Sequence, residues 1–353
     1  MQLGIIGMPL VGKTTIFELL TESREHLNQA KSNMAMARIP DERIDFLSDM
    51  YHPRKTTYAQ MEIVDIPGLV PGADKGSAVF LESVRRADAL LHVVRAFEDE
   101  SVPSYNNEIN PIADIETVKY ELLLADLDLV EKRIERIQAS KKKNDLQDEL
   151  ELLQRLQDSL TNEVPLSSMT FSDKEEIMMS SFQFLTLKPV LICLNVSEND
   201  LVNQDDKKWE EIAAYAEASH YPIVRVSASI EREIAELEGE EKDVFLDEMG
   251  ITESGLVKIA RSMYQRLNLI SFFTVGEDEV RAWTIEGGTA ARKAAGKIHS
   301  DIERGFIRAE VVEYENLKRL GSMPAVKENG LFRLEGKEYV VKDGDIVHFR
   351  FNV

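Results

Sequence analysis

The chain has one cysteine, no long hydrophobic run and few positive charges. A single cysteine among 353 residues excludes a disulfide framework and a cysteine-based zinc site. Cys193 lies in an apolar run, where it is predicted to be a small buried residue. No segment approaches the roughly 18 consecutive apolar residues of a membrane-spanning helix, and none has the pattern of a secretory leader. We therefore expect a cytoplasmic protein with no membrane partner.

The shortage of positive charge limits the kind of nucleic acid that the chain could bind. Lys and Arg number 42 against 63 Asp and Glu, for a net charge of -21. Such a balance argues against charge-driven wrapping of duplex nucleic acid, and we expect no specific binding of DNA. The excess acid lies almost entirely in residues 1–276. Residues 277–353 are nearly neutral, and residues 141–143 are three consecutive lysines.

Hydrophobic patterning predicts an α/β fold with additions. Short apolar runs, typical of strands buried on both faces, are separated by helical patterns, which indicates a mostly parallel sheet wound by helices. These runs cover residues 2–6, 60–66, 87–94, 189–194 and 222–226.

Two further regions differ from this pattern. Leucines and isoleucines at spacings of three and four over residues 123–137 and 146–160 predict two helices in an antiparallel hairpin. After residue 269, short strands separated by glycines predict a small β-rich domain. The expected strands are residues 271–275, 282–285, 332–334, 339–341 and 346–351. The expected domains are thus an α/β domain (1–120 and 186–276), an inserted coiled-coil hairpin (121–185) and a C-terminal domain (277–353).

A phosphate-binding loop follows the first predicted strand. Residues 7–14, GMPLVGKT, match G-x-x-x-x-G-K-[ST] between a strand and a helix, which is the context that this motif requires. The backbone N–H groups of this loop are expected to bind phosphate at the positive end of the helix dipole. Lys13 supplies charge to the phosphates, and the Thr14 hydroxyl suits Mg²⁺. The expected N–H donors are Leu10, Val11, Gly12, Lys13, Thr14 and Thr15.

A second motif, D-x-x-G, ends the strand at residues 60–66. Asp65 is expected to hold Mg²⁺ through water, and the Gly68 N–H to sense the γ-phosphate. Ras-like GTPases place a water-orienting glutamine next, but here the residue is Leu69, which cannot hydrogen-bond water. Hydrolysis must therefore follow a different route, or be slow.

The predicted base pocket departs from the guanine-reading pattern N-K-x-D. Asn195, Val196 and Glu198 occupy its place, so the carboxylate is one methylene longer and the lysine is absent. This change should weaken selectivity for guanine. Ser227 and Ala228, after the next strand, are expected to close the pocket through backbone N–H groups.

These residues together resemble the YchF, or Obg-like ATPase, family of P-loop NTPases. The similarity extends over nearly the whole chain, and the tail is its most specific part. The resemblance implies a nucleotide-binding domain, an inserted coiled coil, a C-terminal TGS domain, binding of ATP with Mg²⁺, and association with ribosomes. It also makes Lys141, Lys142 and Lys143 a candidate RNA contact. The matching segments include DIPGLVPGADKG, ADALLHVVRAFED, ELLLADLDLVEKR, KPVLICLNVSEND, VSASIEREIAEL and GEDEVRAWTIEGGTAARKAAGKIHSDIERGFIRAEV.

The sequence also departs from the family pattern at several positions. Leu10 replaces an asparagine, residues 28–40 contain no switch threonine, and residues 98–111 contain no histidine, with Ser104 near the usual position. Ser229 stands where a lysine is common. These departures cluster around hydrolysis and leave phosphate binding intact.

Three functions are consistent with these residues. The first is a ribosome-associated ATPase with slow turnover, in which Lys13, Thr14, Asp65 and Gly68 serve hydrolysis. The second is a GTPase of the same fold. The third is a non-hydrolysing scaffold whose bound nucleotide only sets the shape of the protein.

Overall fold

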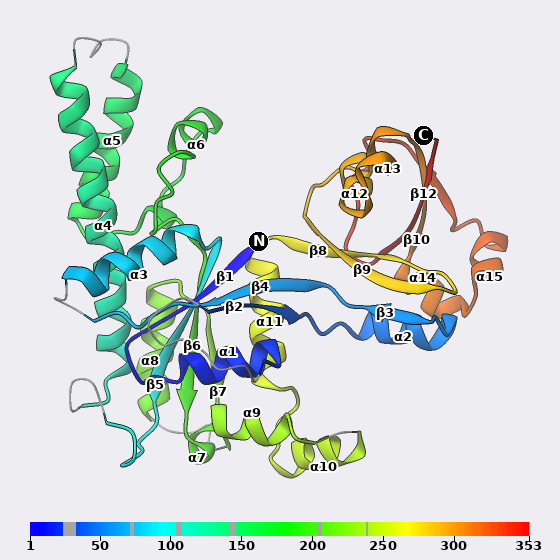
Figure 1. Ribbon diagram of the computed structural model, residues 1–353, viewed down its shortest axis with the longest axis horizontal. Coiled ribbons are helices and arrows are strands. Elements are labelled where there is room, and N and C mark those ends of the chain that lie inside the picture. Colours follow the sequence, from blue (N-terminus) through cyan, green and yellow to red (C-terminus); the bar gives the residue numbers. More distant parts are fainter. Residues whose placement is uncertain are drawn as a thin grey trace. The chain divides into compact units, whose positions relative to one another are not determined.

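The computed structural model describes residues 1–353 except 24–32, 71–73, 104–107, 141–145, 203–206, 238 and 353. The chain divides into two compact units, each described here by itself (Figure 1). The first unit comprises Met1–Met36 and Glu62–Ile259, and the second comprises Ala37–Met61 and Ala260–Val353. The second unit therefore starts earlier than the predicted C-terminal domain and includes an additional segment from the N-terminal part of the chain.

The first unit contains a six-stranded sheet in the order β2-β4-β1-β5-β6-β7. The pairs β4–β1, β1–β5, β5–β6 and β6–β7 are parallel, as the apolar runs predict. Every residue of β5 is buried, which fits a central strand covered on both faces. The strands are β1 (Gln2–Ile6), β2 (Asn33–Arg38), β4 (Gln60–Asp65), β5 (Ala89–Ala96), β6 (Val190–Val196) and β7 (Ile223–Val226).

The helices of the first unit follow the strands as a doubly wound fold requires. They are α1 (Lys13–Thr21), α3 (Asp74–Arg86), α4 (Pro111–Ala139), α5 (Gln147–Thr161), the 3₁₀ helix η2 (Leu166–Ser168), α6 (Asp173–Met179), α7 (Glu198–Val202), α8 (Lys207–Ala218), α9 (Ala228–Ile234) and α10 (Glu240–Glu248). A further helix, α11 (Gly255–Arg266), begins at the end of this unit.

Helices α4 and α5 form the two arms of the predicted hairpin, and Figure 1 draws them side by side. Helix α4 begins at Pro111, well before residue 121, because Asn110 caps it and a proline suits its first position. Its first turns pack Ile115 into the core beside the sheet, whereas Ile134 and Ile137 pack with leucines of α5. The same helix is thus part of the sheet domain at one end and of the hairpin at the other.

Asp126 fixes the base of this hairpin. The carboxylate is fully buried in α4 and accepts hydrogen bonds from Leu185 N (2.9 Å), Thr186 N (2.8 Å) and Thr186 Oγ1 (2.8 Å). These contacts join α4 to the segment that leads back into β6.

The second unit contains another six-stranded sheet, ordered β11-β10-β12-β8-β9-β3. The pairs β12–β8 and β3–β9 are parallel, and β10–β11, β10–β12 and β8–β9 are antiparallel. The strands are β3 (Lys55–Thr57), β8 (Leu269–Thr274), β9 (Glu279–Glu286), β10 (Phe306–Glu313), β11 (Arg333–Glu335) and β12 (Asp345–Phe351). The helices are α2 (Glu42–Tyr51), α12 (Ala291–Ile298), α13 (Ser300–Arg304), α14 (Tyr314–Leu320) and α15 (Met323–Glu328).

Two features of this sheet differ from the sequence expectation. The run at residues 339–341, expected as a strand, makes only an isolated bridge between Val340 and Ala290. Asp345 accepts hydrogen bonds from Lys342 N and Tyr339 Oη, which bends the chain into a turn there. Strand β10, which pairs with both β11 and β12, was not predicted, since it alternates poorly between polar and apolar residues.

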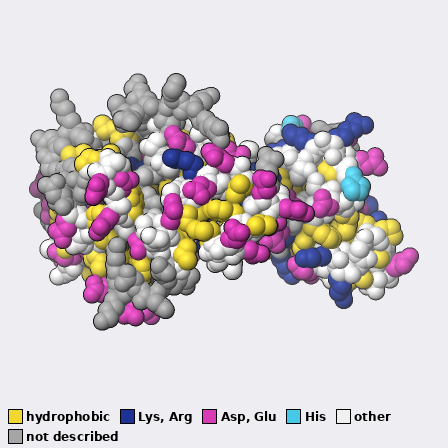
Figure 2. All heavy atoms as spheres, turned by 90° about the horizontal axis from the view of Figure 1, so that it is seen from below, with side chains coloured by type: hydrophobic (Ala, Val, Ile, Leu, Met, Phe, Trp, Pro, Cys, Tyr) yellow, Lys and Arg dark blue, Asp and Glu magenta, His cyan; other side chains and the backbone are white. Residues whose placement is uncertain are grey.

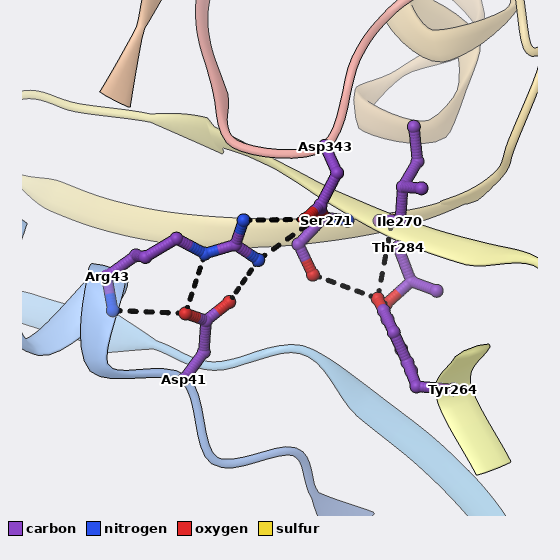
Figure 3. Close-up of polar contacts among 7 residues, drawn as sticks. All are labelled: Asp41, Arg43, Tyr264, Ile270, Ser271, Thr284 and Asp343. Carbon is purple, nitrogen blue, oxygen red and sulfur yellow. Dashed lines mark hydrogen bonds and ion pairs between the residues drawn. The ribbon is translucent and has the colours of Figure 1, made fainter. Parts of the chain in front are cut away.

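An ion-pair network joins α2 to the C-terminal part of the second unit (Figure 3). The Arg43 guanidinium donates to both carboxylate oxygens of Asp343, at 2.7 and 3.2 Å, and to both oxygens of Asp41. Asp343 also accepts from the backbone N–H of Ser271. Nearby, the Tyr264 hydroxyl hydrogen-bonds Ser271 Oγ and Thr284 Oγ1.

The charge distribution over the two units agrees with the sequence. On the face drawn in Figure 2, the charged side chains visible on the first unit are mainly acidic. The part of the second unit that contains α12 to α15 (Figure 1) displays Lys and Arg beside acidic side chains in Figure 2. Among the described helices, none is both long and apolar enough to cross a membrane.

Candidate functional site

A cavity of about 870 Å³ opens in the first unit where β1, β4, β5 and β6 end. The carboxyl edge of a parallel sheet is the usual ligand position in such folds. Most of the predicted site residues line this cavity: Leu10, Gly12, Lys13, Thr14, Thr15, Asp65, Gly68, Asn195, Val196, Glu198 and Ala228. Val11 and Ser227 are buried and are not part of its lining.

The loop between β1 and α1 has the backbone conformation of a phosphate cradle. Gly7 and Gly12 have φ angles of 145° and 96°, which favour glycine. A Cβ on Gly7 would lie 2.2 Å from the Val93 carbonyl oxygen, and one on Gly12 would lie 2.4 Å from Asn195 Nδ2. Both glycines are therefore needed for the close approach of the loop. Leu10 also has a positive φ, 63°, although it carries a side chain.

Lys13, the first residue of α1, places its ammonium group within the loop. Nζ donates to the Met8 carbonyl oxygen at 2.8 Å, and the side chain is buried. Burial lowers the pKa of Lys13 to about 8, with Asp65 opposing this shift. A Cβ on Gly68 would approach Nζ to 3.1 Å and Pro9 N to 3.0 Å, so this glycine allows the second loop to lie close to the first.

Thr14 and Asp65 form a pair suited to a hard cation. Thr14 Oγ1 donates to Asp65 Oδ2 at 2.9 Å, while Asp65 Oδ1 is buried and has no hydrogen-bond partner among the described residues. Burial raises the pKa of the Asp65 carboxyl. An unpartnered carboxylate oxygen beside a hydroxyl fits the oxygen ligands and bound water that Mg²⁺ prefers.

Leu69 is directed away from the cavity. Its side chain is fully buried, and its backbone N–H donates to the Gly7 carbonyl oxygen at 3.1 Å. The residue therefore packs in the core and ties the two loops together through the backbone. It offers no polar side-chain atom to an attacking water.

Asn195 braces the loops around the cavity. Its Nδ2 donates to the Val11 carbonyl oxygen at 3.0 Å, and its Oδ1 accepts from Ala228 N at 3.1 Å. The amide thus joins the phosphate loop to the start of α9. Glu198 begins α7 at the cavity, and Ser227 Oγ lies 2.9 Å from Ser229 Oγ.

Several residues at this site were not among the predicted ones. Arg95 is buried at the end of β5, and the loop that follows it contributes Phe97, Glu98, Asp99 and Val102 to the cavity wall. The FED tripeptide marks this loop in the sequence, but its role depends on contacts with Arg95 that no local pattern reveals. Ser229 and Arg232 also line the cavity.

Two further polar side chains are buried near the site. Glu231 of α9 accepts hydrogen bonds from Ser254 Oγ and Gly255 N, both at 2.6 Å. His92 of β5 is buried, and burial lowers its pKa to about 3. Lys141, Lys142 and Lys143, the candidate RNA contact, lie outside the described residues.

Comparisons with known proteins match this chain along nearly its whole length. A family model described as 50S ribosome-binding GTPase matches residues 2–130, and a YchF-GTPase C-terminal model, described as a protein of unknown function, matches residues 269–352. The ribosome-binding ATPase YchF of Bacillus subtilis is 44% identical over 99% of both chains, and that of Escherichia coli O157:H7 is 40% identical over the same shares.

Two solved structures are similar to this chain along nearly its whole length. The YchF GTPase of Schizosaccharomyces pombe superposes with a TM-score of 0.88 at 33% identity, covering 99% of this chain and 97% of that one. A GTP-binding protein of Pyrococcus horikoshii OT3 covers both chains fully with a TM-score of 0.58 at 19% identity, a likeness of fold. Since relatives of this identity align along their full length, the chain belongs to the YchF family.

Proposed function

We propose that this protein binds and slowly hydrolyses ATP with Mg²⁺ and associates with ribosomes. The observation that carries the proposal is the cavity in which Lys13, Thr14 and Asp65 meet, because it combines a phosphate cradle with a cation site. Its relatives named ribosome-binding ATPase YchF support the same reading.

The residues would divide the work of phosphoryl transfer among them. The N–H groups of residues 10–15 and the Lys13 ammonium would bind the phosphates and stabilise charge on the transferring group. Thr14 and Asp65 would hold Mg²⁺ directly and through water, and the Gly68 N–H would contact the γ-phosphate. A bound Mg²⁺ supplies further neutralisation of phosphate charge. Because Leu69 is buried, no side chain at this position orients water, which favours slow turnover.

The base specificity rests on the loop after β6. Glu198 lines the cavity where an aspartate would read guanine, and its longer side chain displaces the carboxylate. We therefore place ATP before GTP. Titration with labelled ATP and GTP tests this order, and a clear preference for GTP would favour the second candidate, a GTPase. The name of the solved relative, YchF GTPase, supports keeping a GTPase as the second candidate.

Hydrolysis itself is tested against a variant that lacks the phosphate-binding charge. Turnover of ATP by the wild-type protein should exceed that of Lys13→Ala by at least about a hundredfold, as expected for loss of a charge that stabilises the transition state. Equal rates would favour the non-hydrolysing scaffold. Arg86→Ala is a suitable control, because Arg86 is exposed on α3 outside the cavity.

The surfaces that contact the ribosome remain a proposal from the sequence. We assign them to the hairpin (121–185), with its lysines at 141–143, and to a TGS domain at 277–353, both attached to the nucleotide-binding domain at 1–120 and 186–276. A ribosome partner also places the protein in the cytoplasm. Replacement of Lys141, Lys142 and Lys143 by Glu should reduce co-sedimentation with ribosomes without changing nucleotide affinity. An unchanged ribosome-bound fraction would exclude the lysines as a contact.

A further inference from the structure

Arg95 is a buried arginine whose donors are directed at the loop that follows it. The residue is 5% exposed at the carboxyl end of β5. It donates four hydrogen bonds to backbone carbonyl oxygens of residues 97–103. Their lengths are 3.1 Å from Nε to Phe97 O, 3.1 Å from Nη1 to Pro103 O, and 3.4 and 3.0 Å from Nη2 to Asp99 O and Val102 O.

The planar guanidinium group of Arg95 also packs on the Phe97 side chain. The guanidinium carbon lies 4.6 Å from the centre of the Phe97 ring, a cation–π distance. On the exposed side of the loop, Asp99 Oδ1 accepts from Ser101 N at 2.8 Å and Ser101 Oγ at 2.6 Å. The Arg95 guanidinium therefore holds the loop on its buried side, and the Asp99–Ser101 turn holds it on its exposed side.

This loop forms the cavity wall beside the predicted base pocket. The parallel register pairs Arg95 with Asn195 and Ala96 with Val196, so the chains leave β5 and β6 side by side. Phe97, Glu98 and Asp99 consequently line the cavity together with Ser197, Glu198 and Asn199. The phosphate loop contributes a different part of the lining.

We propose that Arg95 is a positioning residue that preforms the wall against the base and ribose of the nucleotide. This inference rests on the proposed function of nucleotide binding. A loop ordered before the ligand arrives spares the ligand the entropic cost of ordering it. Lysine cannot replace the residue in this role, because one ammonium group cannot reach four carbonyl oxygens in the geometry of a planar fork.

The test compares a nucleotide with a ligand that has only its phosphate part. In Arg95→Lys, which keeps the charge, ATP should bind about tenfold more weakly, since a loosened wall must be ordered on binding. Inorganic tripolyphosphate, measured by competition on the same protein, should bind as it does to the wild type. A KM that rises with little change in kcat should accompany the loss of affinity.

A matched control and a second variant make the result decisive. Arg86→Lys makes the same exchange at an exposed position and should change neither affinity. Ser101→Gly loosens the loop from its exposed side without disturbing the core. It should weaken ATP binding less than Arg95→Lys does and should leave tripolyphosphate binding unchanged. The inference would be overturned if Arg95→Lys weakened the binding of ATP and tripolyphosphate equally, or weakened neither. If Arg95→Lys does not fold, an unchanged ATP affinity in Ser101→Gly would overturn it. Failure of the wild-type protein to bind ATP or GTP would instead refute the proposed function.

Discussion

Arg43 and Asp343, 300 positions apart in the sequence, form a two-point ion pair in the second unit (Figure 3). Arg43 lies at the start of α2, in the segment Ala37–Met61, and Asp343 lies in the turn before β12. The pair shows how a segment between the sequence motifs at residues 7–14 and 65–68 becomes part of the second unit. Strand β3 of the same segment extends that sheet beside β9.

This ion pair should contribute measurably to the stability of the second unit. Arg43→Met removes the guanidinium donors to Asp343 and Asp41 and leaves an unbranched, apolar side chain in their place. It should lower the free energy of unfolding by about 1–2 kcal/mol, a modest value because both partners are partly exposed. Fluorescence of Trp283 on β9 can report this transition in a Trp209→Phe background, because the chain has two tryptophans and Trp209 lies in the first unit.

The control for this experiment is Arg54→Met. Arg54 pairs with Asp278, but both side chains are almost fully exposed, so the loss should stay below about 0.5 kcal/mol. An equal loss of unfolding free energy in the two variants would show that Arg43 stabilises the protein no more than an exposed surface charge does.

Asp126 should be among the most sensitive polar residues of the hairpin. Asp126→Asn replaces one carboxylate oxygen by an NH₂ group, which would face backbone donors of Leu185 or Thr186. Because the site is fully buried, we expect the free energy of unfolding to fall by about 2–4 kcal/mol. Denaturant unfolding of a Trp283→Phe background, followed by Trp209 fluorescence, measures the effect in the first unit.

Asp128 provides the matched position, two residues further along α4. It is exposed, and among the described residues its ion pair is with Lys132 of the next turn, so Asp128→Asn should cost less than about 0.5 kcal/mol. If Asp126→Asn were as mild, the buried hydrogen bonds would not hold the base of the hairpin.

The parts of the fold that the sequence predicts are those specified by local pattern. Strands β1, β4, β5 and β6 were recognisable because central parallel strands are continuous apolar runs. The edge strand β7, with the sequence IVRV, was recognisable from a short apolar run of the same kind. The short strand β3, with the polar sequence KTT, has no such signature and exists because β9 provides a partner. Strand β2 was equally invisible, since it is an edge strand with exposed Met34 and Met36.

The same distinction holds within the site. The position of Gly12, Lys13 and Thr14 beside one another at the cavity could be predicted, because one short motif fixes their spacing. The importance of Arg95 could not, because it depends on carbonyl oxygens that a folded loop brings to one point. Asn195 was expected to contact the nucleotide, and its described contacts are with Val11 and Ala228.

Leu10 offers a position at which a substitution should stabilise the protein. Its φ of 63° disfavours a branched apolar side chain, and the residue is 54% exposed, so little apolar burial would be lost. Asparagine tolerates this conformation, and Leu10→Asn should raise the free energy of unfolding by about 0.5–1 kcal/mol in the absence of nucleotide. Thermal unfolding of the two proteins checks the direction.

The same exchange at Leu124 separates backbone strain from polarity. Leu124 is also exposed but lies within the right-handed helix α4, where asparagine has the lower helix propensity. Leu124→Asn should therefore destabilise the protein by about 0.5 kcal/mol. A loss of stability in both variants would argue against strain at Leu10.

The pKa of Lys13, about 8, predicts a pH dependence of nucleotide binding in the alkaline range. Bound phosphates favour the charged ammonium, so binding above pH 8 requires uptake of a proton, and affinity should fall by up to about tenfold per pH unit. Stability of the nucleotide-free protein should change in the opposite sense. The unfolded chain holds the Lys13 proton up to about pH 10.5, so it binds more protons than the folded chain, and this residue's contribution to stability rises between pH 8 and 10.5. Titrations with ATP from about pH 7 to about pH 9.5 measure the first effect. In Lys13→Ala the remaining affinity should vary much less over this range, and a wild-type affinity that does not change would exclude a lowered pKa at Lys13.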